Sequence, residues 1–272
     1  MQLKSDITLE QVTKDNFPGD YEALVKVWQN QCYGPVSTNY SQSLLHHPEF
    51  LAILNQSPCV TSILDLRTQQ FDFISSNVEA ILGYASCRFV QGGLAFYNTV
   101  VHPDDLQNTW KLRRTIWEFI LTLPAADQVQ FKFNYDYRII KPCGKEVRVF
   151  AQNSVLQSDN RGNITHIMAV YSDISHWKKS EQQLASIVSN AKDTCLFFST
   201  EGNEPCHTPS SLSKRELEIV KLMAEGYSSK IIADKLFISF HTVNTHRQKI
   251  MEKTKTKNTG GLVQFVISHG LI

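Results

Sequence analysis

A predicted helix near the C-terminus carries side chains that could bind nucleic acid. Ser239 is suited to cap a helix that reaches about Lys253. At about 100° per residue, Val243 and Ile250 share one face, and four hydrogen-bonding residues lie mostly opposite: His241, Asn244, Thr245 and Gln248. Groups of this kind can bond base edges in a major groove, while cations at the flanks neutralise phosphates. An ordinary solvated amphipathic helix has the same pattern, so the wheel alone does not decide.

The flanks of this helix carry the residues suited to phosphate. Thr242, Arg247 and Lys249 lie there, and further lysines follow at Lys253, Lys255 and Lys257. Hydroxyl and cationic groups placed this way orient a protein on a duplex without reading its sequence.

The remaining reactive residues form no recognisable catalytic or metal site. The cysteines are scattered without a C-x-x-C pair, which favours reduced thiols over disulfides or a zinc site: Cys32, Cys59, Cys87, Cys143, Cys195 and Cys206. His102 with Asp104 and Asp105 could pass for acid–base chemistry, but with Pro103 these residues are better explained as a helix start. We expect no enzyme and no metal site.

The charge is divided unequally along the chain. The 272 residues suggest about two domains, and their net charge is +1. From Pro209 onward there are ten Lys and Arg against five Asp and Glu, a net +5, which leaves 17 against 21, a net −4, before it. The segment around this point is rich in turn formers and predicts a linker over residues 199–208.

The distribution of apolar residues indicates where in the cell the chain is expected to act. Its first residues lack the apolar stretch of a secretory signal. No apolar run approaches the roughly 20 residues that a membrane helix needs. We therefore expect a cytoplasmic, nucleoid-associated protein without a membrane contact.

The basic segment predicts four helices. Ser213 and Glu216 have the spacing of a capping box, followed by a first helix that ends near Gly226. A second helix is predicted from about Ser229 to Leu236, and a fourth from about Thr259 to Ser268.

This segment resembles the LuxR-type (GerE-like) helix-turn-helix domain over about 61 residues. The resemblance rests on Leu212–Glu216, Gly226, Ile232-Ala233, Ile238-Ser239 and Thr242-Val243, with His246, Ile250, Lys253 and Gly270-Leu271. It implies a four-helix module whose third helix enters the major groove of double-stranded DNA, usually as a homodimer on a pseudo-palindrome. The family's base-reading positions fall on Asn244, Thr245 and Gln248. Its backbone-contacting positions fall near Lys230, Thr242, Arg247, Lys249 and Lys253. The junction at Thr254–Gly261 departs from the family pattern, just before the helix that the family uses to dimerise.

The acidic segment predicts strand, strand, helices and three further strands from Cys59 onward. Apolar residues alternate from Val129 to Ile139, and two more strands flank a loop at Ser158–Asn163. Leu106, Trp110, Trp117 and Ile120 form a helical stripe.

Residues 58–178 resemble a PAS domain. Four motifs occur in the expected order: Asn77–Tyr84, Val101–Leu106, Tyr137–Lys141 with Gly144, and Val170–Ser175. The resemblance implies helices against a five-stranded antiparallel sheet, with a pocket for a small-molecule or protein ligand that the fold does not identify.

One string within this domain is similar to the flavin-binding motif of the LOV subset. Ser86–Gly92 contains Cys87, but Ser86 replaces an Asn, Cys87 comes early after Gly83, and the later Phe-x-Asn pattern is missing. We expect a solvent-side or packing cysteine rather than a flavin site. His102 and His46-His47 similarly give no reason to expect haem, so no cofactor is predicted.

Two segments match neither family. In residues 1–57, helices are predicted at Tyr21–Cys32 and Leu44–Leu54, which would cover the PAS sheet or form a dimer contact. Residues 179–198 keep a three–four apolar spacing that predicts a connecting helix, either a short coiled coil or a helix packed on its own PAS domain.

The sequence therefore predicts an α+β chain: a helical extension (1–57), a PAS sensor (58–178), a connecting helix (179–198), a linker (199–208) and a helix-turn-helix domain (209–272). We expect a sequence-specific DNA-binding transcriptional regulator modulated by its PAS domain. The alternative is a protein-interaction module whose helix-turn-helix no longer binds DNA.

Overall fold

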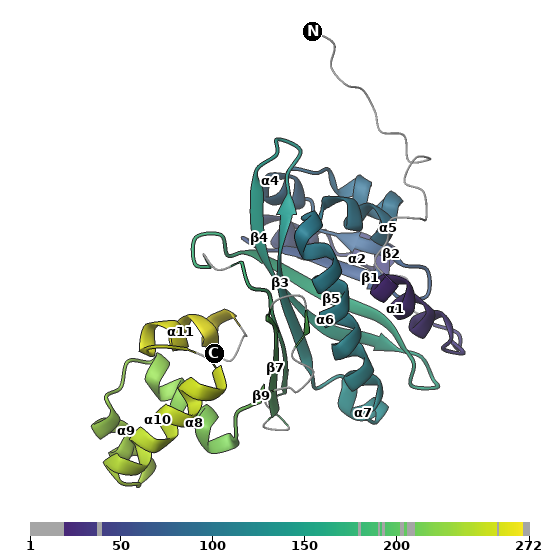
Figure 1. Ribbon diagram of the computed structural model, residues 1–272. Helices are drawn as coiled ribbons and strands as arrows, with labels where there is room; N and C mark the ends of the chain where they lie inside the picture. The colour runs from purple at the N-terminus through teal and green to yellow at the C-terminus, as the bar shows by residue number, and fades with distance from the viewer. Residues whose placement is uncertain are drawn as a thin grey trace.

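The computed structural model describes residues 19–36, 40–178, 181–189, 191, 194–201, 204–205, 210–254 and 256–268. A mixed helix and sheet domain is followed by a group of four C-terminal helices (Figure 1). Within these ranges no helix combines the length and the apolar character needed to cross a lipid bilayer.

Five antiparallel strands form the sheet of the predicted PAS sensor, which we call the sensor sheet after that prediction. They are β1 (Val60–Asp65), β2 (Gln70–Ile74), β3 (Lys132–Ile140), β4 (Glu146–Ser158) and β5 (Ile164–Asp173), in the spatial order β2-β1-β5-β4-β3. The aromatic positions of the predicted strand, Phe133, Tyr135 and Tyr137, are buried in the main core as expected, but Asn134 and Asp136 between them are buried too, so the strand is not half-buried. The predicted PAS strands are therefore all present.

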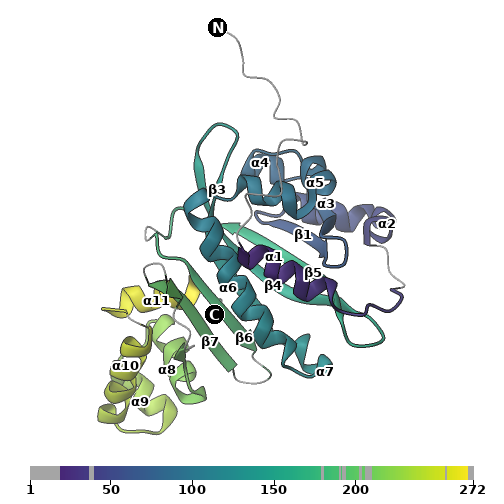
Figure 2. The ribbon, with the colours of Figure 1, turned by 45° about the vertical axis from the view of Figure 1, so that its right-hand side comes forward.

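Four helices lie between β2 and β3 in the chain: α4 (Val78–Leu82), α5 (Ser86–Val100), α6 (Pro103–Leu121) and α7 (Ala125–Gln128). Helix α6 crosses one face of the sheet (Figure 2). Its start is capped by His102, whose Nδ1 accepts from the Asp104 amide at 3.3 Å. Helix α5 kinks at Gly93, where φ is +53° and a Cβ would lie 2.5 Å from the Gln69 carbonyl oxygen. Only glycine fits that close approach.

The N-terminal extension adds three helices, α1 (Gly19–Gln29), α2 (Tyr40–Leu45) and α3 (Pro48–Gln56). The helix predicted at Tyr21–Cys32 is confirmed as α1. The one predicted at Leu44–Leu54 is divided, because Pro48 starts a new helix after His46-His47. Helix α1 lies alongside α6 (Figure 2), with Tyr21 and Trp28 packed edge-on against Trp110 and Trp117 at 4.6 and 5.4 Å.

The predicted connecting helix at 179–198 is wrong, because this segment forms strands. They are β6 (Leu184–Ser189) and β7 (Thr194–Glu201), followed by the short β8 (Glu204–Pro205) and β9 (Ser210–Ser211). Strand β6 pairs with β3, and β7 pairs with β6, so the sheet continues past the five PAS strands. The physical reason is that β3 would otherwise be an open edge whose backbone groups need partners. The predicted linker consequently begins inside β7.

The C-terminal helices are α8 (Lys214–Ala224), α9 (Ser229–Leu236), α10 (Phe240–Thr254) and α11 (Thr259–Ser268). All four helices predicted for this segment are confirmed, as is the capping box of Ser213 and Glu216. Ile219, Ile232, Val243 and Ile250 are fully buried and form the centre of a small core.

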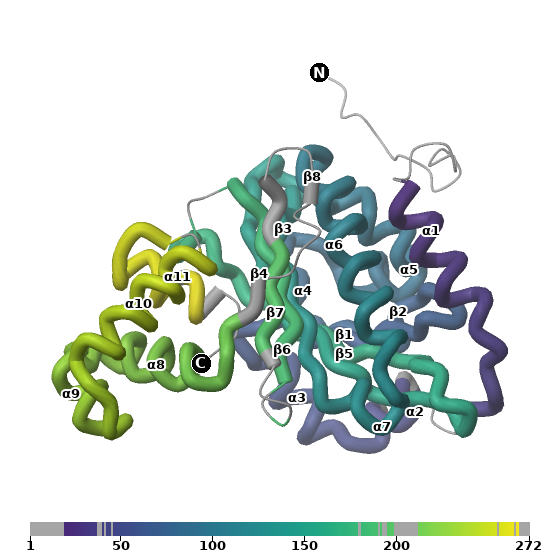
Figure 3. The backbone as a smooth tube through the Cα atoms, turned by 60° about the horizontal axis from the view of Figure 1, so that its bottom comes forward, coloured from purple at the N-terminus to yellow at the C-terminus, as the bar shows by residue number. Residues whose placement is uncertain are grey.

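This small core includes side chains from the extended sheet. Val188 on β6 and Cys195 and Phe197 on β7 belong to the same buried cluster as the helices. The Phe197 ring packs edge-on against Phe265 of α11, with centroids 4.9 Å apart. Figure 3 shows the four helices beside the β6–β7 end of the sheet. The two domains are therefore joined by packing as well as by the chain.

The capping box gives a pH-dependent prediction for stability. Burial alone would raise the pKa of Glu216, but hydrogen bonds from Lys253 and Ser213 outweigh it, and the pKa lies below its ordinary 4.5. A lowered carboxyl pKa stabilises the fold above about pH 4.5 and loses that effect as pH falls through the lowered value. Glu216→Gln should therefore lower the free energy of unfolding of this domain by about 1–2 kcal/mol at neutral pH, and the difference should disappear in acid.

Urea unfolding across pH, followed by circular dichroism, measures this effect. The matched control is Glu218→Gln, whose carboxylate pairs with Arg215 on the same helix but is 41% exposed. Equal stability of Glu216→Gln and wild type at neutral pH would contradict the assignment.

Candidate nucleic-acid interface and sensory cavity

Helix α10 is oriented by its cap and its two buried residues. The Ser239 hydroxyl accepts from the Thr242 amide at 3.0 Å, as the predicted N-cap should. Val243 and Ile250 are completely buried against the helices beneath. Since these two positions fix the rotation of the helix, the opposite side must face outward.

We call that outward side the reading face: His241, Asn244, Thr245 and Gln248, all exposed. Thr245 donates to the carbonyl of His241, and Gln248 donates to Glu252 at 3.1 Å. Both contacts lie within the exposed helix surface, so a base edge could replace them at little cost. The structure brings all three predicted base-reading residues onto one accessible surface.

The predicted backbone-contacting residues fall into two groups. Lys230 on α9 and Thr242 and Lys249 on α10 are exposed. Arg247 and Lys253 are half-buried and already hold protein partners: Arg247 donates to the Thr259 hydroxyl at 3.0 Å, and Lys253 bonds Glu216 at 2.7 Å. Lys253 thus ties α10 to the start of α8, a role the sequence did not indicate.

The unusual junction before α11 is ordered by short polar side chains. Thr254 donates to the carbonyl of Ile250, and Asn258 accepts from the Gly261 amide at 2.8 Å. Asn258 therefore caps α11 at the predicted start, in spite of the departure from the family pattern.

The turn between α9 and α10 exposes apolar side chains that the sequence reading missed. Phe237 is 95% exposed and has φ +53°, and Ile231 and Phe240 are also exposed. The Phe237 amide closes the end of α9 by bonding the carbonyl of Ala233. A positive φ is uncommon in a bulky residue. The sequence signal for a turn at Phe237 was the new helix start predicted at Ile238-Ser239.

The sensor domain encloses a cavity between its sheet, α1 and α6. Its volume is about 30 Å³, which is room for roughly two water molecules. Aromatic and polar side chains line it, among them Trp28, Phe71, Tyr97, Trp110, Arg113 and Tyr135. Trp28 shows that the N-terminal extension completes the cavity wall.

Several hydrogen-bonding groups of this lining lack partners among the described residues. These are Nε1 of Trp28, Nε of Arg113 and the hydroxyl of Tyr135. Burial raises the pKa of Tyr135 well above its usual value, so the hydroxyl keeps its proton. A buried polar group without a partner costs about 1–3 kcal/mol, so the cavity wall carries hydrogen-bonding groups that a ligand could satisfy.

The residues considered for flavin or haem do not converge on this cavity. Cys87 is an exposed thiol near the start of α5, and His46 and His47 are exposed between α2 and α3. His102 caps α6 and contacts Glu146 through Nε2 at 3.2 Å. None of these side chains belongs to the lining, so they do not fit a cofactor there.

One group of side chains could in principle ligate a metal. Ligand atoms of Asp65, Asp72 and His166 lie within 4.8 Å of one another. However, Arg67 donates to both carboxylate oxygens of Asp65, at 2.9 and 2.7 Å. A metal would compete with that guanidinium, so the geometry fits a buried ion-pair cluster better.

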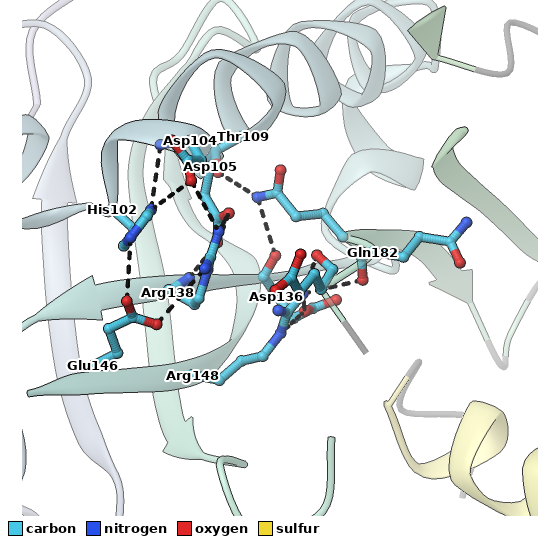
Figure 4. A network of polar contacts seen from close by, with 11 residues as sticks. His102, Asp104, Asp105, Thr109, Asp136, Arg138, Glu146, Arg148 and Gln182 are labelled. Carbon is cyan, nitrogen blue, oxygen red and sulfur yellow. Dashed lines mark hydrogen bonds and ion pairs between the residues drawn. The ribbon is translucent and has the colours of Figure 1, made fainter. Parts of the chain in front are cut away.

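Beside the cavity, a polar network fixes where the chain leaves the sensor (Figure 4). Asp136 on β3 and Arg148 on β4 are both buried and bond at 2.6 Å. The second oxygen of Asp136 accepts from Lys178 at 2.7 Å and from the Leu184 amide at 2.8 Å. Burial lowers the pKa of Lys178.

The same network reaches the segment that precedes β6. Arg148 donates to the carbonyls of Glu181 and Gln182, and Gln183 donates to the Thr109 hydroxyl of α6 at 2.7 Å. Thr109 is the neighbour of Trp110 in the cavity wall. The start of β6 is therefore held by Thr109 and Asp136, which are next in sequence to the lining residues Trp110 and Tyr135.

Two family models match parts of this chain. One described as "Bacterial regulatory proteins, luxR family" matches residues 210–266, and one described as "PAS fold" matches residues 71–171. The chain therefore contains a luxR-family domain and a PAS domain, as its motifs predicted.

Curated relatives share only part of the sequence. The oxygen regulatory protein NreC of Staphylococcus aureus is 48% identical over 79 residues, 28% of this chain and 36% of that protein. NreC of Staphylococcus carnosus is 48% identical over 61 residues, 22% of this chain and 28% of that protein. The chain thus spans about a third of the length of the relatives it matches.

Solved structures resemble the chain more weakly. The VqmA dimer of Vibrio cholerae, described without its target DNA, is 16% identical, with a TM-score of 0.34, and the match covers 82% of this chain and 88% of VqmA. The PAS/PAC sensor domain of a Marinobacter aquaeolei diguanylate cyclase is 20% identical, with a TM-score of 0.34 and coverage of 43% and 96%.

Proposed function

We propose that this chain, which joins a PAS domain to a luxR-family domain, is a sequence-specific DNA-binding transcriptional regulator. The observation that carries the proposal is the reading face, an accessible row of hydrogen-bonding side chains with exposed cations beside it. As a regulator it would act at the chromosome, in the cytoplasm, and would have no catalytic step of its own.

The residue types on α10 suit a major groove. Asn and Gln side chains can donate to and accept from adenine at once, so Asn244 and Gln248 can distinguish base pairs. Lys230 and Lys249 can neutralise phosphates on either side, which supplies affinity without sequence preference. Arg247 and Lys253 contribute positive charge, but their side chains already donate hydrogen bonds to Thr259 and Glu216.

The two domains offer a route for regulation. Strand β6 begins at the polar network beside the cavity, and β7 contacts α11 through Phe197 and Phe265. A ligand that changes the sensor could therefore change how the helices sit on β7, which is a population shift between arrangements. The acidic sensor would restrain the basic domain electrostatically in one of them.

A homodimer fits this function, because two reading faces on one duplex would recognise a pseudo-palindrome. The predicted connecting helix is replaced by the β6–β7 hairpin. In this proposal the hairpin, rather than a coiled coil, sets the placement of each reading face.

A second candidate is a protein-interaction module. The exposed side chains of Ile231, Phe237 and Phe240 favour it, since apolar groups gathered on a surface often mark a contact site. A gel shift at low and raised salt separates the two: retardation that salt weakens supports DNA binding, and no retardation supports the interaction module.

The DNA proposal predicts different effects for two neighbouring substitutions. Gln248→Ala should relax base preference at one position, at a cost of about 1–3 kcal/mol on the preferred site. Lys249→Ala should weaken binding to all duplexes similarly and reduce the salt slope by about 1. Binding to duplexes selected from a random library, measured by fluorescence anisotropy against salt, checks both. Wild-type behaviour of both variants would refute the assignment of α10.

The coupling proposal predicts that loosening the domain contact strengthens DNA binding. Phe197→Ala removes the ring that packs on Phe265 and should raise the DNA affinity of the full chain several-fold, because the restraint is weakened. Hydrogen exchange in β7 should rise in parallel. The control is Val129→Ala, which truncates a side chain that is 54% exposed on the sensor domain. Faster exchange with unchanged DNA affinity would show that the contact does not regulate binding.

A further inference from the structure

The unpartnered polar groups at the wall of the sensor cavity are hydrogen-bond donors. Among the described residues, the groups without partners at its wall are the indole N–H of Trp28, the Nε–H of Arg113 and the hydroxyl of Tyr135. Indole and guanidinium nitrogens can only donate hydrogen bonds. The cavity therefore presents donors that need acceptors.

Arg113 also brings a positive charge that no carboxylate balances. No Asp or Glu belongs to the described lining of the cavity. Its guanidinium donates to the Tyr97 hydroxyl at 2.6 Å and lies over the rings of Trp110 and Tyr97, 4.7 and 5.0 Å from their centroids. Ring faces attract a cation, but more weakly than an anion does.

Two other arginines of the sensor domain do have carboxylate partners. Arg138 forms a two-pronged pair with Asp105, and Arg148 pairs with Asp136. Each thus has the carboxylate that a buried guanidinium ordinarily requires. Arg113 lacks one, although its Nε is fully buried.

From this contrast we propose that the cavity binds a small oxyanion, which acts as the missing partner of Arg113. Its oxygens would accept from Arg113, Trp28 and Tyr135, and its body would lie against the aromatic walls. The small volume favours a compact, planar group such as a short carboxylate. A carboxylate with an apolar body and an inorganic oxyanion share this chemistry, and only the first would use the walls fully.

As the signal of the sensor, this ligand rests on the proposed function. Trp28 makes the N-terminal extension part of the binding site, since α1 supplies one of the three donors. Trp110 adjoins Thr109, which bonds Gln183 ahead of β6. Occupancy could therefore be sensed at the start of the hairpin.

Titration of the full chain, followed by calorimetry and tryptophan fluorescence, tests the proposal. The probes are formate, acetate, propionate and nitrate at constant ionic strength, with formamide, acetamide and propionamide as uncharged counterparts. We expect at least one anion to bind at least tenfold more tightly than its amide. Nitrate as the tighter ligand would indicate an inorganic oxyanion, and acetate or propionate would indicate a carboxylate with an apolar body.

Variants identify the site. Arg113→Met should reduce anion affinity at least tenfold, and Arg113→Lys should retain part of it. Tyr135→Phe removes only a hydroxyl, so it tests the donor set even if Arg113→Met fails to fold. The matched control is Arg88→Met, since Arg88 also lies over an aromatic ring, at 4.9 Å from Phe96, but outside the cavity lining.

The outcomes separate this proposal from the proposed function. If no anion binds, if amides bind equally, or if Arg113→Met and Tyr135→Phe both keep wild-type affinity, the cavity holds only water and the proposal is overturned. DNA binding by the same preparation would leave the proposed regulator intact. Anion binding that leaves DNA affinity unchanged would support the site and refute its role as the signal.

Discussion

The open edge of the sensor sheet is the constraint on which the arrangement of this molecule depends. Strand β3 ends the five-stranded order, and its outer backbone groups would be unpaired without a further strand. Strand β6 pairs with it over Lys132–Tyr135, β7 follows as a hairpin, and the luxR-family helices pack on β7. Backbone pairing fixes the first two steps and side-chain packing the third, so the luxR-family domain is joined through β7 and β6 to β3, which contributes to one wall of the sensor cavity. Tyr135 lies in that pairing and in the cavity lining.

Buried ion pairs and hydrogen bonds also hold the junction between the sensor strands and β6. Asp136 receives hydrogen bonds from Arg148, Lys178 and the Leu184 amide, so its carboxylate joins two sensor strands to the start of β6. Removing one member of such a cluster would leave the others as uncompensated buried charges, which is strongly unfavourable. The cluster therefore holds the start of β6 at one defined place beside β3 and β4. Arg113, in the same domain, lines the cavity without a carboxylate partner among the described residues, and that difference is what points to a ligand.

Local signals explain which parts of the structure the sequence could predict. Ser213 and Ser239 mark helix starts because their hydroxyls accept from backbone amides three residues on, and Pro103 does so because its ring fixes φ. The apolar positions of β3 predicted a strand, so these elements followed from short windows. Strand β6 did not, because Leu184, Val188 and Cys195 have helical spacing while the partner that selects a strand, β3, lies far back in the sequence. The reading face followed from the positions of Val243 and Ile250. The ion pair of Lys253 with Glu216 and the donors at the cavity depend on contacts between distant segments, although Arg113 does lie on the predicted stripe between Trp110 and Trp117.

The central claim is that the outward side of α10 binds DNA while its domain remains joined to the sensor sheet. Hydrogen–deuterium exchange of the full chain, with and without duplex DNA and at low and raised salt, measures this most directly. The account predicts that DNA slows exchange over 240–254, that salt reverses the effect, and that exchange in β7 changes together with it. Unchanged exchange over 240–254 in the presence of saturating DNA would contradict the account.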